Sequence, residues 1–175
     1  MKELILGGVR SGKSARAEQL AQASGLEVIY FATATAGDGE MAQRIARHRA
    51  DRPSHWLTVE EPLALAQALR QHAAAERCLI VDCLTLWLTN LLLLDDDGAL
   101  AQQQRALLDS VATLAGQIIF VSNEVNMGVV PMDALSRRFC DEAGRLHQQL
   151  AAQCDRVTLM VAGLPVFAKG REESL

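Results

Sequence analysis

The residues best suited to chemistry lie in one glycine-rich segment near the start of the chain. The pattern G-x-x-x-x-G-K-[ST] is matched at every fixed position by Gly7-Gly8-Val9-Arg10-Ser11-Gly12-Lys13-Ser14. Glycines let the backbone curl until several N–H groups converge on phosphate oxygens, and a following helix presents its positive end to them. Lys13 supplies a mobile charge for the β- and γ-phosphates, and the Ser14 hydroxyl is a magnesium ligand. The segment therefore predicts a site for ATP or GTP.

The neighbouring sequence supplies the context that this pattern needs. An apolar strand is expected at residues 4–6, directly before the glycines, and a helix at residues 14–21, directly after them. A second acidic element is expected at Asp82, which ends an apolar strand at residues 78–82. Ligands bind at the carboxyl ends of strands in α/β sheets, so Asp82 is a candidate to hold magnesium through water. The alternative is an aspartate that only caps the next helix.

Short apolar strands alternate with amphipathic helices along the rest of the chain. Further strands are expected at residues 28–32, 56–59, 117–122 and 156–162, and helices at 41–49, 62–69, 100–114 and 132–153. Residues 95–98 are expected to form a solvated loop, and the leucine-rich segment 84–94 either a core helix or an interface. The alternation predicts a mostly parallel sheet with helices on both faces, in a single domain over residues 1–175.

Composition excludes several classes of protein. The 175 residues are 50% apolar and 22% charged, with a net charge of -4, so a nucleic-acid binder is not expected. The longest apolar stretch is far shorter than the roughly 20 residues that cross a bilayer, so no transmembrane segment is expected. No signal-peptide pattern begins the chain, and the four cysteines have no metal-ligand spacing. A cytoplasmic protein is the resulting expectation.

Three further stretches sharpen the functional prediction. They are RIARHRADRP at residues 44–53 with WLTVE at 56–60, VDCLTLWLTN at 81–90, and SNEVNMGVVP at 122–131. Together with the phosphate segment, they resemble the bifunctional adenosylcobinamide kinase/adenosylcobinamide-phosphate guanylyltransferase family of cobalamin biosynthesis. The resemblance extends from residue 4 to about residue 169.

The resemblance implies a P-loop NTPase of RecA-like fold, assembled as a homotrimer. It implies phosphorylation of the corrinoid adenosylcobinamide and then transfer of GMP from GTP to give adenosylcobinamide-GDP. The GMP would pass through a GMP-histidine intermediate at His48, with Mg2+ present. The implied nucleotide contacts are residues 7–14, Ala32, Thr33, Ala34, Arg49, Ala50, Asp51, Arg52, Glu60 and Asp82. Two positions depart from the family pattern: Asn126 stands where glycine is expected, and His147 where asparagine is expected.

The residues around His48 are compatible with this role. Met41, Ile45 and His48 share one face of the expected helix, which alone favours a partly buried histidine. Four nearby arginines favour a triphosphate instead, and a neutral imidazole is nucleophilic at physiological pH. The other histidines are expected to be structural or solvated, with His72 and His147 on exposed helix faces.

Two other functions share the phosphate segment. A monofunctional P-loop small-molecule kinase would transfer only the γ-phosphate, and its His48 would be structural. A GTP-binding regulatory module would normally carry an Asn-Lys-x-Asp motif, which the sequence lacks. For the kinase step, the candidates to accept the hydroxyl proton are Asp82 and Glu124.

Overall fold

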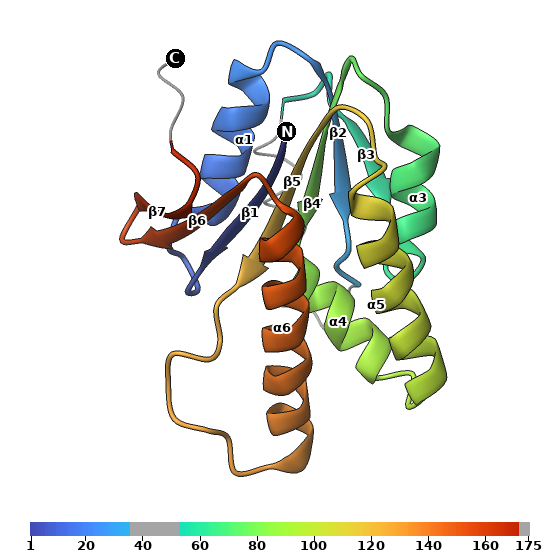
Figure 1. The fold of residues 1–175 in the computed structure, drawn as a ribbon, viewed down its shortest axis with the longest axis vertical. Helices are drawn as coiled ribbons and strands as arrows, with labels where there is room; N and C mark the ends of the chain where they lie inside the picture. Colours follow the sequence, from blue (N-terminus) through green and yellow to red (C-terminus); the bar gives the residue numbers. More distant parts are fainter. Residues whose placement is uncertain (36–52, 172–175) are drawn as a thin grey trace.

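The structure, a computed structural model, describes residues 1–35 and 53–171. Within these residues one seven-stranded sheet runs between two layers of helices (Figure 1). The strands are β1 (Lys2–Gly7), β2 (Glu27–Ala32), β3 (Leu57–Glu60), β4 (Arg77–Asp82), β5 (Gln117–Asn123), β6 (Arg156–Val161) and β7 (Leu164–Lys169). They lie in the order β3-β2-β4-β5-β1-β6-β7. Every neighbouring pair from β3 to β6 is parallel, and β7 pairs antiparallel with β6.

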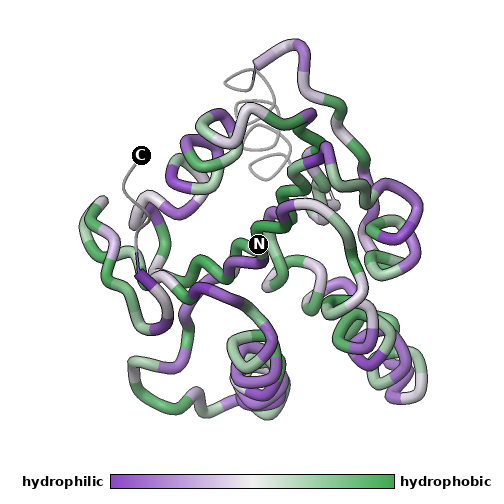
Figure 2. Tube along the Cα trace, turned by 45° about the horizontal axis from the view of Figure 1, so that its top comes forward, coloured by the Kyte–Doolittle hydropathy of each residue, from purple (hydrophilic) through white to green (hydrophobic). Residues whose placement is uncertain are grey.

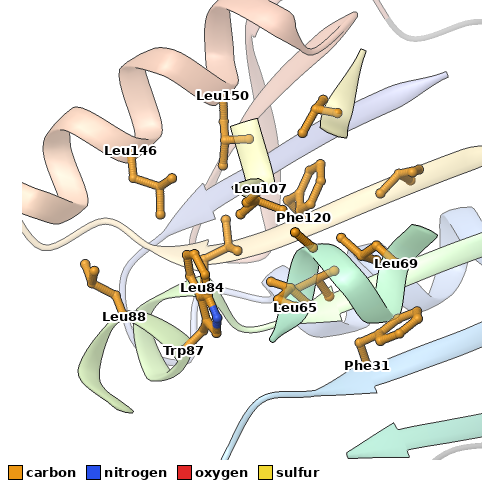
Figure 3. Packing of buried hydrophobic residues seen from close by; sticks show 14 of the residues in the cluster. Phe31, Leu65, Leu69, Leu84, Trp87, Leu88, Leu107, Phe120, Leu146 and Leu150 are labelled. Carbon is orange, nitrogen blue, oxygen red and sulfur yellow. The ribbon is translucent and has the colours of Figure 1, made fainter. Parts of the chain in front are cut away.

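Helices cover both faces of this sheet, as the alternation of strands and helices predicts. The described helices are α1 (Lys13–Ala23), α3 (Leu65–His72), α4 (Leu84–Leu92), α5 (Asp97–Val111) and α6 (Ala134–Gln153). Ala17 and Ala21 of α1 pack with Ile5 on one face, whereas Leu4 points to the other face. On that second face, α3 to α6 enclose the larger apolar cluster, part of which Figure 3 shows around Trp87 and Phe120.

The apolar positions explain why the strands lie at the centre. Strands β2, β4 and β5 each carry a run of buried residues, which is typical of parallel strands that are covered on both faces. Figure 2 shows this as hydrophobic colour along the central strands, while hydrophobic and hydrophilic positions alternate along the surrounding helices. In the part of the chain that the structure describes, no helix is both long and apolar enough to cross a membrane.

Several helix boundaries differ from the sequence expectation because side chains cap the helices. Helix α5 begins at Asp97, inside the expected loop, because the carboxylate of Asp96 accepts the N–H of Ala99 at 3.0 Å. In the same way Asp133 caps α6, which begins at Ala134. Helix α3 begins later than expected because Glu61 accepts the N–H groups of the two residues just before it.

Two further segments complete the comparison. The leucine-rich segment is a core helix, α4, whose Trp87 is fully buried and donates its indole N–H to the carbonyl of Leu63 at 2.9 Å. The sequence expectation missed β7, the antiparallel strand reached through the turn at Ala162 and Gly163. The expected helix at residues 41–49 lies outside the described residues.

A buried ion pair joins β1 to β6. Glu3 is 0% exposed, and its Oε2 accepts hydrogen bonds from Arg156 at 2.6 Å and 2.8 Å. The hydroxyl of Thr158 donates to Oε1 of Glu3 at 2.7 Å. Both carboxylate oxygens are therefore satisfied, which is the condition under which a buried charge is tolerated. The pair holds together the two strands whose carboxyl ends flank the glycine-rich segment.

Removing one partner of this pair is expected to be costly. Arg156→Met leaves a buried carboxylate without its cation, so the free energy of unfolding should fall by about 3–5 kcal/mol. Adding Glu3→Met should recover part of this loss, because the double variant buries no lone charge. Urea unfolding measures both quantities. The matched control is Arg105→Met, which breaks an ion pair to Asp109 on the exposed face of α5; an equal loss in the control would contradict this account.

His147 lies in the core of the α6 layer and not on an exposed helix face, so that expectation was wrong. It is 6% exposed, and its Nε2 is 2.7 Å from the hydroxyl oxygen of Ser122 in β5. Burial lowers the pKa of His147 below its ordinary value of 6.5, and the negative charge of Glu124 offsets part of this lowering. The imidazole is therefore neutral in the folded chain at neutral pH.

This buried histidine predicts a pH dependence of stability. The unfolded chain binds a proton at His147 more tightly than the folded chain does. Its contribution is thus fully present above pH about 6.5 and is lost as the pH falls from there through the lower folded pKa. His147→Asn should flatten the decline in unfolding free energy between about pH 7 and about pH 5, measured by urea unfolding. The exposed His55→Asn is the control, and an equal decline in wild type and His147→Asn would contradict the prediction.

Candidate functional site

The parallel register brings the polar strand ends to one edge of the sheet. Gly7 at the end of β1 is paired with Asn123 at the end of β5. Ala32 at the end of β2 lies between Glu60 of β3 and Asp82 of β4. Because all these strands run the same way, their carboxyl ends meet where ligands bind in α/β sheets. The glycine-rich segment begins at this edge and runs directly into α1.

Two glycines of this segment, hereafter the phosphate loop (residues 7–14), adopt conformations that other residues avoid. Gly7 has φ 154°, and a Cβ there would lie 2.5 Å from the Ser11 hydroxyl oxygen and 2.7 Å from the Met160 carbonyl oxygen. Gly12 caps α1 in the left-handed region with φ 98°. A side chain at either position would be strained, and at Gly7 it would also collide with backbone. The pattern thus fixes glycine where the backbone must turn tightly.

The phosphate loop is anchored from both sides. The N–H of Glu124, just beyond β5, donates to the carbonyl of Gly7 at 2.9 Å. On the other side, the N–H of Gly163 in the β6–β7 turn donates to the carbonyl of Ser11 at 3.0 Å. Both anchors use loop carbonyls and no loop N–H group; within the loop, the N–H of Ser11 donates to the Gly8 carbonyl at 3.3 Å. This arrangement suits an anion at the N-terminal end of α1.

Lys13 and Ser14 open α1 at the surface of this loop. Lys13 is only 8% exposed, and its ammonium donates to the carbonyl of Gly8 at 2.6 Å. The charge is therefore held over the loop and not extended into solvent. The hydroxyl of Ser11 is also buried and has no hydrogen-bond partner among the described residues. A polar group left unpaired at a buried site is costly, so it marks a place where a polar ligand would be stabilising.

Asp82 faces the same side of the sheet as α1. Side chains alternate along a strand, so Asp82 shares a face with Ile80, which packs with Ala17 of α1. Its carboxylate is half-buried, and Oδ2 accepts the hydroxyl of Tyr30 at 2.7 Å. A carboxylate and the Ser14 hydroxyl are both oxygen donors, the type that Mg2+ prefers. Mg2+ usually keeps several waters and needs few protein ligands, so these two residues fit it.

Next to the carboxyl ends of the strands, a network of hydrogen bonds fixes the start of α4 and the segment that follows β2. The hydroxyl of Thr33 is fully buried and exchanges hydrogen bonds with the backbone of Cys83, accepting its N–H at 2.9 Å and donating to its carbonyl at 2.7 Å. The Asn123 amide donates to the Thr85 hydroxyl at 2.9 Å. Asn90 donates to the Thr33 carbonyl at 2.8 Å. The network ties β2, β4 and β5 to α4.

The cysteine in this network is unsuited to nucleophilic chemistry. Burial raises the pKa of the Cys83 thiol, and the negative charge of Asp82 raises it further. A thiol kept protonated is a poor nucleophile. Its sulfur lies 3.0 Å from the Thr85 hydroxyl oxygen, so its role in the described structure is a hydrogen bond within the core.

The structure gathers some of the predicted site residues and does not describe others. Phosphate-loop residues, Ala32, Thr33, Ala34 and Asp82 lie at one edge, with the exposed Glu60 next in register. His48, Arg49, Ala50, Asp51 and Arg52 lie outside the described residues. Tyr30 and Asn123 were missed, because only strand pairing shows which side chains lie beside Asp82 and Gly7. Asn126, which stands where the family pattern has glycine, does not adopt left-handed backbone angles, and its side-chain amide donates to the Cys140 carbonyl at 3.2 Å.

Solved structures share this architecture at low sequence identity. The RadB recombinase superposes with a TM-score of 0.55 at 16% identity, over 90% of this chain and 73% of that chain. The P4 protein from bacteriophage phi6, in complex with ADP, gives a TM-score of 0.50 at 15% identity, over 94% of this chain and 53% of that chain. These likenesses concern the fold alone, and they confirm the expected RecA-like fold, a mostly parallel sheet with helices on both faces.

Relatives in sequence are much closer. The bifunctional adenosylcobalamin biosynthesis protein CobP of Pseudomonas aeruginosa is 64% identical over 170 residues, covering 97% of this chain and 98% of the relative. The bifunctional adenosylcobalamin biosynthesis protein CobU of Escherichia coli is 38% identical over 182 residues, covering 97% of this chain and all of the relative. The sequence model of one family matches residues 3–167, nearly the whole chain. The chain therefore belongs to the cobinamide kinase/cobinamide phosphate guanyltransferase family of enzymes.

Proposed function

We propose that this chain phosphorylates adenosylcobinamide and then transfers GMP from GTP to adenosylcobinamide phosphate, which gives adenosylcobinamide-GDP. The observation that carries the proposal is the phosphate loop at the carboxyl edge of the sheet, in a chain 64% identical to a bifunctional relative over nearly its full length. One loop serves both reactions, because each needs a triphosphate whose charge is neutralised and whose reacting phosphorus is held in line.

Nucleotide binding is assigned to the predicted set of residues. The phosphates are assigned to the phosphate loop, residues 7–14, with its backbone N–H groups and Lys13, and Ser14 and Asp82 would hold Mg2+. Bound Mg2+ would withdraw charge from the phosphates during transfer. Sugar and base contacts are assigned to Ala32, Thr33, Ala34, Glu60 and residues 49–52. Thr33 is fully buried, and its hydroxyl, N–H and carbonyl are bonded to Cys83, Asp82 and Asn90, so its assigned part is to hold the backbone of this segment in place.

Guanylyl transfer is assigned two in-line steps through His48. A ring nitrogen of His48 attacks the α-phosphorus of GTP, the bond to the leaving oxygen breaks, and pyrophosphate departs with its charge met by Lys13. An oxygen of the corrinoid phosphate then attacks the same phosphorus, the N–P bond breaks, and His48 is released as neutral imidazole. The resemblance of residues 44–53 to the family supports this role. Of these residues, 44–52 lie outside the part of the chain that the structure describes.

The kinase step needs only a positioned hydroxyl and a proton acceptor. Glu124 is the better candidate for that acceptor, because Asp82 is assigned to the metal. The N–H of Glu124 is bonded to Gly7, which places its backbone beside the phosphate loop. Its Oε1 accepts the N–H of Asn126 at 2.7 Å, which orients the carboxylate. A half-buried carboxylate held beside the phosphate loop is suited to take the hydroxyl proton.

Assembly and location complete the proposal. Residues 1–175 act as one cytoplasmic domain, and three chains form a homotrimer. The loop between β5 and α6, visible in Figure 1 as a long excursion from the sheet edge, supports a contact with another molecule. Its Val129 and Met132 are each 96% exposed, which is unusual for large apolar side chains outside an interface. The corrinoid and a neighbouring chain are the two molecules that this surface fits.

The covalent half-reaction tests the proposal directly. Wild-type protein is incubated with Mg2+ and GTP labelled at either the α- or the γ-phosphate. We expect acid-labile label on the protein from the α position only, and none on His48→Ala, because the imidazole forms the N–P bond. Glu124→Gln should label as wild type does, since the covalent step uses no hydroxyl proton acceptor.

Each outcome separates the alternatives. Bound GTP without protein label would favour the monofunctional kinase, and bound GTP without label or kinase activity would favour the regulatory module. Label on His48→Ala equal to that on wild type would keep the reaction class but move the nucleophile to another residue.

A further inference from the structure

Tyr30 carries the one hydroxyl in the buried run of β2, residues 28–31, whose other members are apolar. It lies in β2 between Ile29 and Phe31, and its side chain is 2% exposed. The ring packs in the cluster between the sheet and α1, with Ala17 among its members. A phenylalanine would fill nearly the same volume without a hydroxyl to satisfy. The structure therefore raises the question of what the hydroxyl does.

The register of β2 and β4 places this hydroxyl next to Asp82 at the carboxyl ends of the strands. Tyr30 is paired with Ile80, and Ala32 is paired with Asp82, in the parallel ladder of β2 and β4. Tyr30 and Asp82 are thus diagonal neighbours on one face, at a separation that long side chains span. The phenol reaches along the strands toward the carboxyl edge and donates its O–H to Oδ2 of Asp82 at 2.7 Å. The bond links the buried layer to the exposed edge.

This hydrogen bond constrains the carboxylate. An ionised aspartate only accepts hydrogen bonds, so donation from Tyr30 occupies Oδ2 from the interior side. Among the described residues, Oδ1 has no hydrogen-bond donor, and Asp82 is half-buried at the phosphate-loop edge. The hydrogen bond to Oδ2 restrains rotation of the carboxylate about its Cβ–Cγ bond, and this also fixes the direction of Oδ1. Groups behind a metal ligand commonly orient it in this way.

We propose that Tyr30 is a positioning residue for magnesium: its hydroxyl fixes Oδ2 of Asp82 so that Oδ1 faces the metal at the phosphate loop. The inference rests on the proposed role of Asp82 and deepens it. In this role Tyr30 touches neither nucleotide nor metal and acts on the site through the Asp82 carboxylate. Removing its hydroxyl should reduce the amount by which Mg2+ tightens nucleotide binding, while the fold and the phosphate loop stay intact.

The test measures how strongly Mg2+ promotes nucleotide binding to the full chain. Calorimetry gives the dissociation constant of an α,β-methylene analogue of GTP, which cannot lose pyrophosphate, in excess Mg2+ and in EDTA. The factor by which Mg2+ tightens binding is compared between variants. Tyr30→Phe should lower this factor about tenfold, as loss of a group behind a metal ligand does. Asp82→Asn should lower it at least as much, and the double variant no further, because both changes act through one carboxylate.

A matched control separates positioning from stability. Ser110→Ala removes another buried hydroxyl hydrogen bond, to the Leu107 carbonyl at 2.7 Å in α5, on the opposite face of the sheet. It should leave the Mg2+ factor at the wild-type value. A factor unchanged in Tyr30→Phe but lowered in Asp82→Asn would overturn the proposal and leave the magnesium role of Asp82 standing. A factor unchanged in both would remove that role and the Tyr30 proposal with it.

A second measurement needs no change at Tyr30. The chain has a single tyrosine, so a 13C label on the phenol carbon that carries the hydroxyl gives one signal. Adding Mg2+ to the wild-type complex with the analogue should shift this signal, and the shift should be absent in Asp82→Asn. A signal that Mg2+ leaves in place would overturn the proposal, even if Tyr30→Phe failed to fold.

Discussion

The parallel register of the sheet is the constraint on which the site depends. Strands β1, β2, β4 and β5 run the same way, so their last residues reach one edge together. A shift of one residue in any pair would turn every side chain of the shifted strand to the opposite face. In β4 such a shift would move Asp82 away from α1 and from the phosphate loop. The apolar runs that fill both faces of the sheet therefore also determine the geometry of its polar edge.

Buried polar groups fix the relative positions of strands and loops where apolar packing alone would not. Glu3 and Arg156 bind the starts of β1 and β6 together, at the opposite end of these strands from the phosphate loop, and Thr33 holds the backbone at Cys83. Each group has partners for its polar atoms, so its burial is compatible with a stable core. The loop itself is bonded through its carbonyls to Glu124 and Gly163. A rigid frame of this kind lets the loop N–H groups meet phosphates with little rearrangement, which is how preorganised sites stabilise charge.

The sequence predicted the parts of the molecule that follow local rules. The phosphate loop carries its chemistry in adjacent residues, and the buried strands are legible as apolar runs. Strand β7 was missed because an exposed edge strand has no such run, and its residues alternate between half-buried and exposed. The burial of His147 was missed because its partner Ser122 lies in another element, far away in the sequence. The bond from Tyr30 to Asp82 likewise depends on pairing between strands, which local patterns do not specify.

A crystal structure with Mg2+ and the α,β-methylene analogue of GTP tests the central claim most directly. The account predicts phosphate oxygens at about 2.7–3.2 Å from the N–H groups of the phosphate loop, with the ammonium of Lys13 turned toward them. It also predicts Mg2+ beside the Ser14 hydroxyl, with Oδ1 of Asp82 directed at the metal or its waters. A triphosphate bound away from residues 7–14, or a metal on the far side of the sheet from Asp82, would contradict the account.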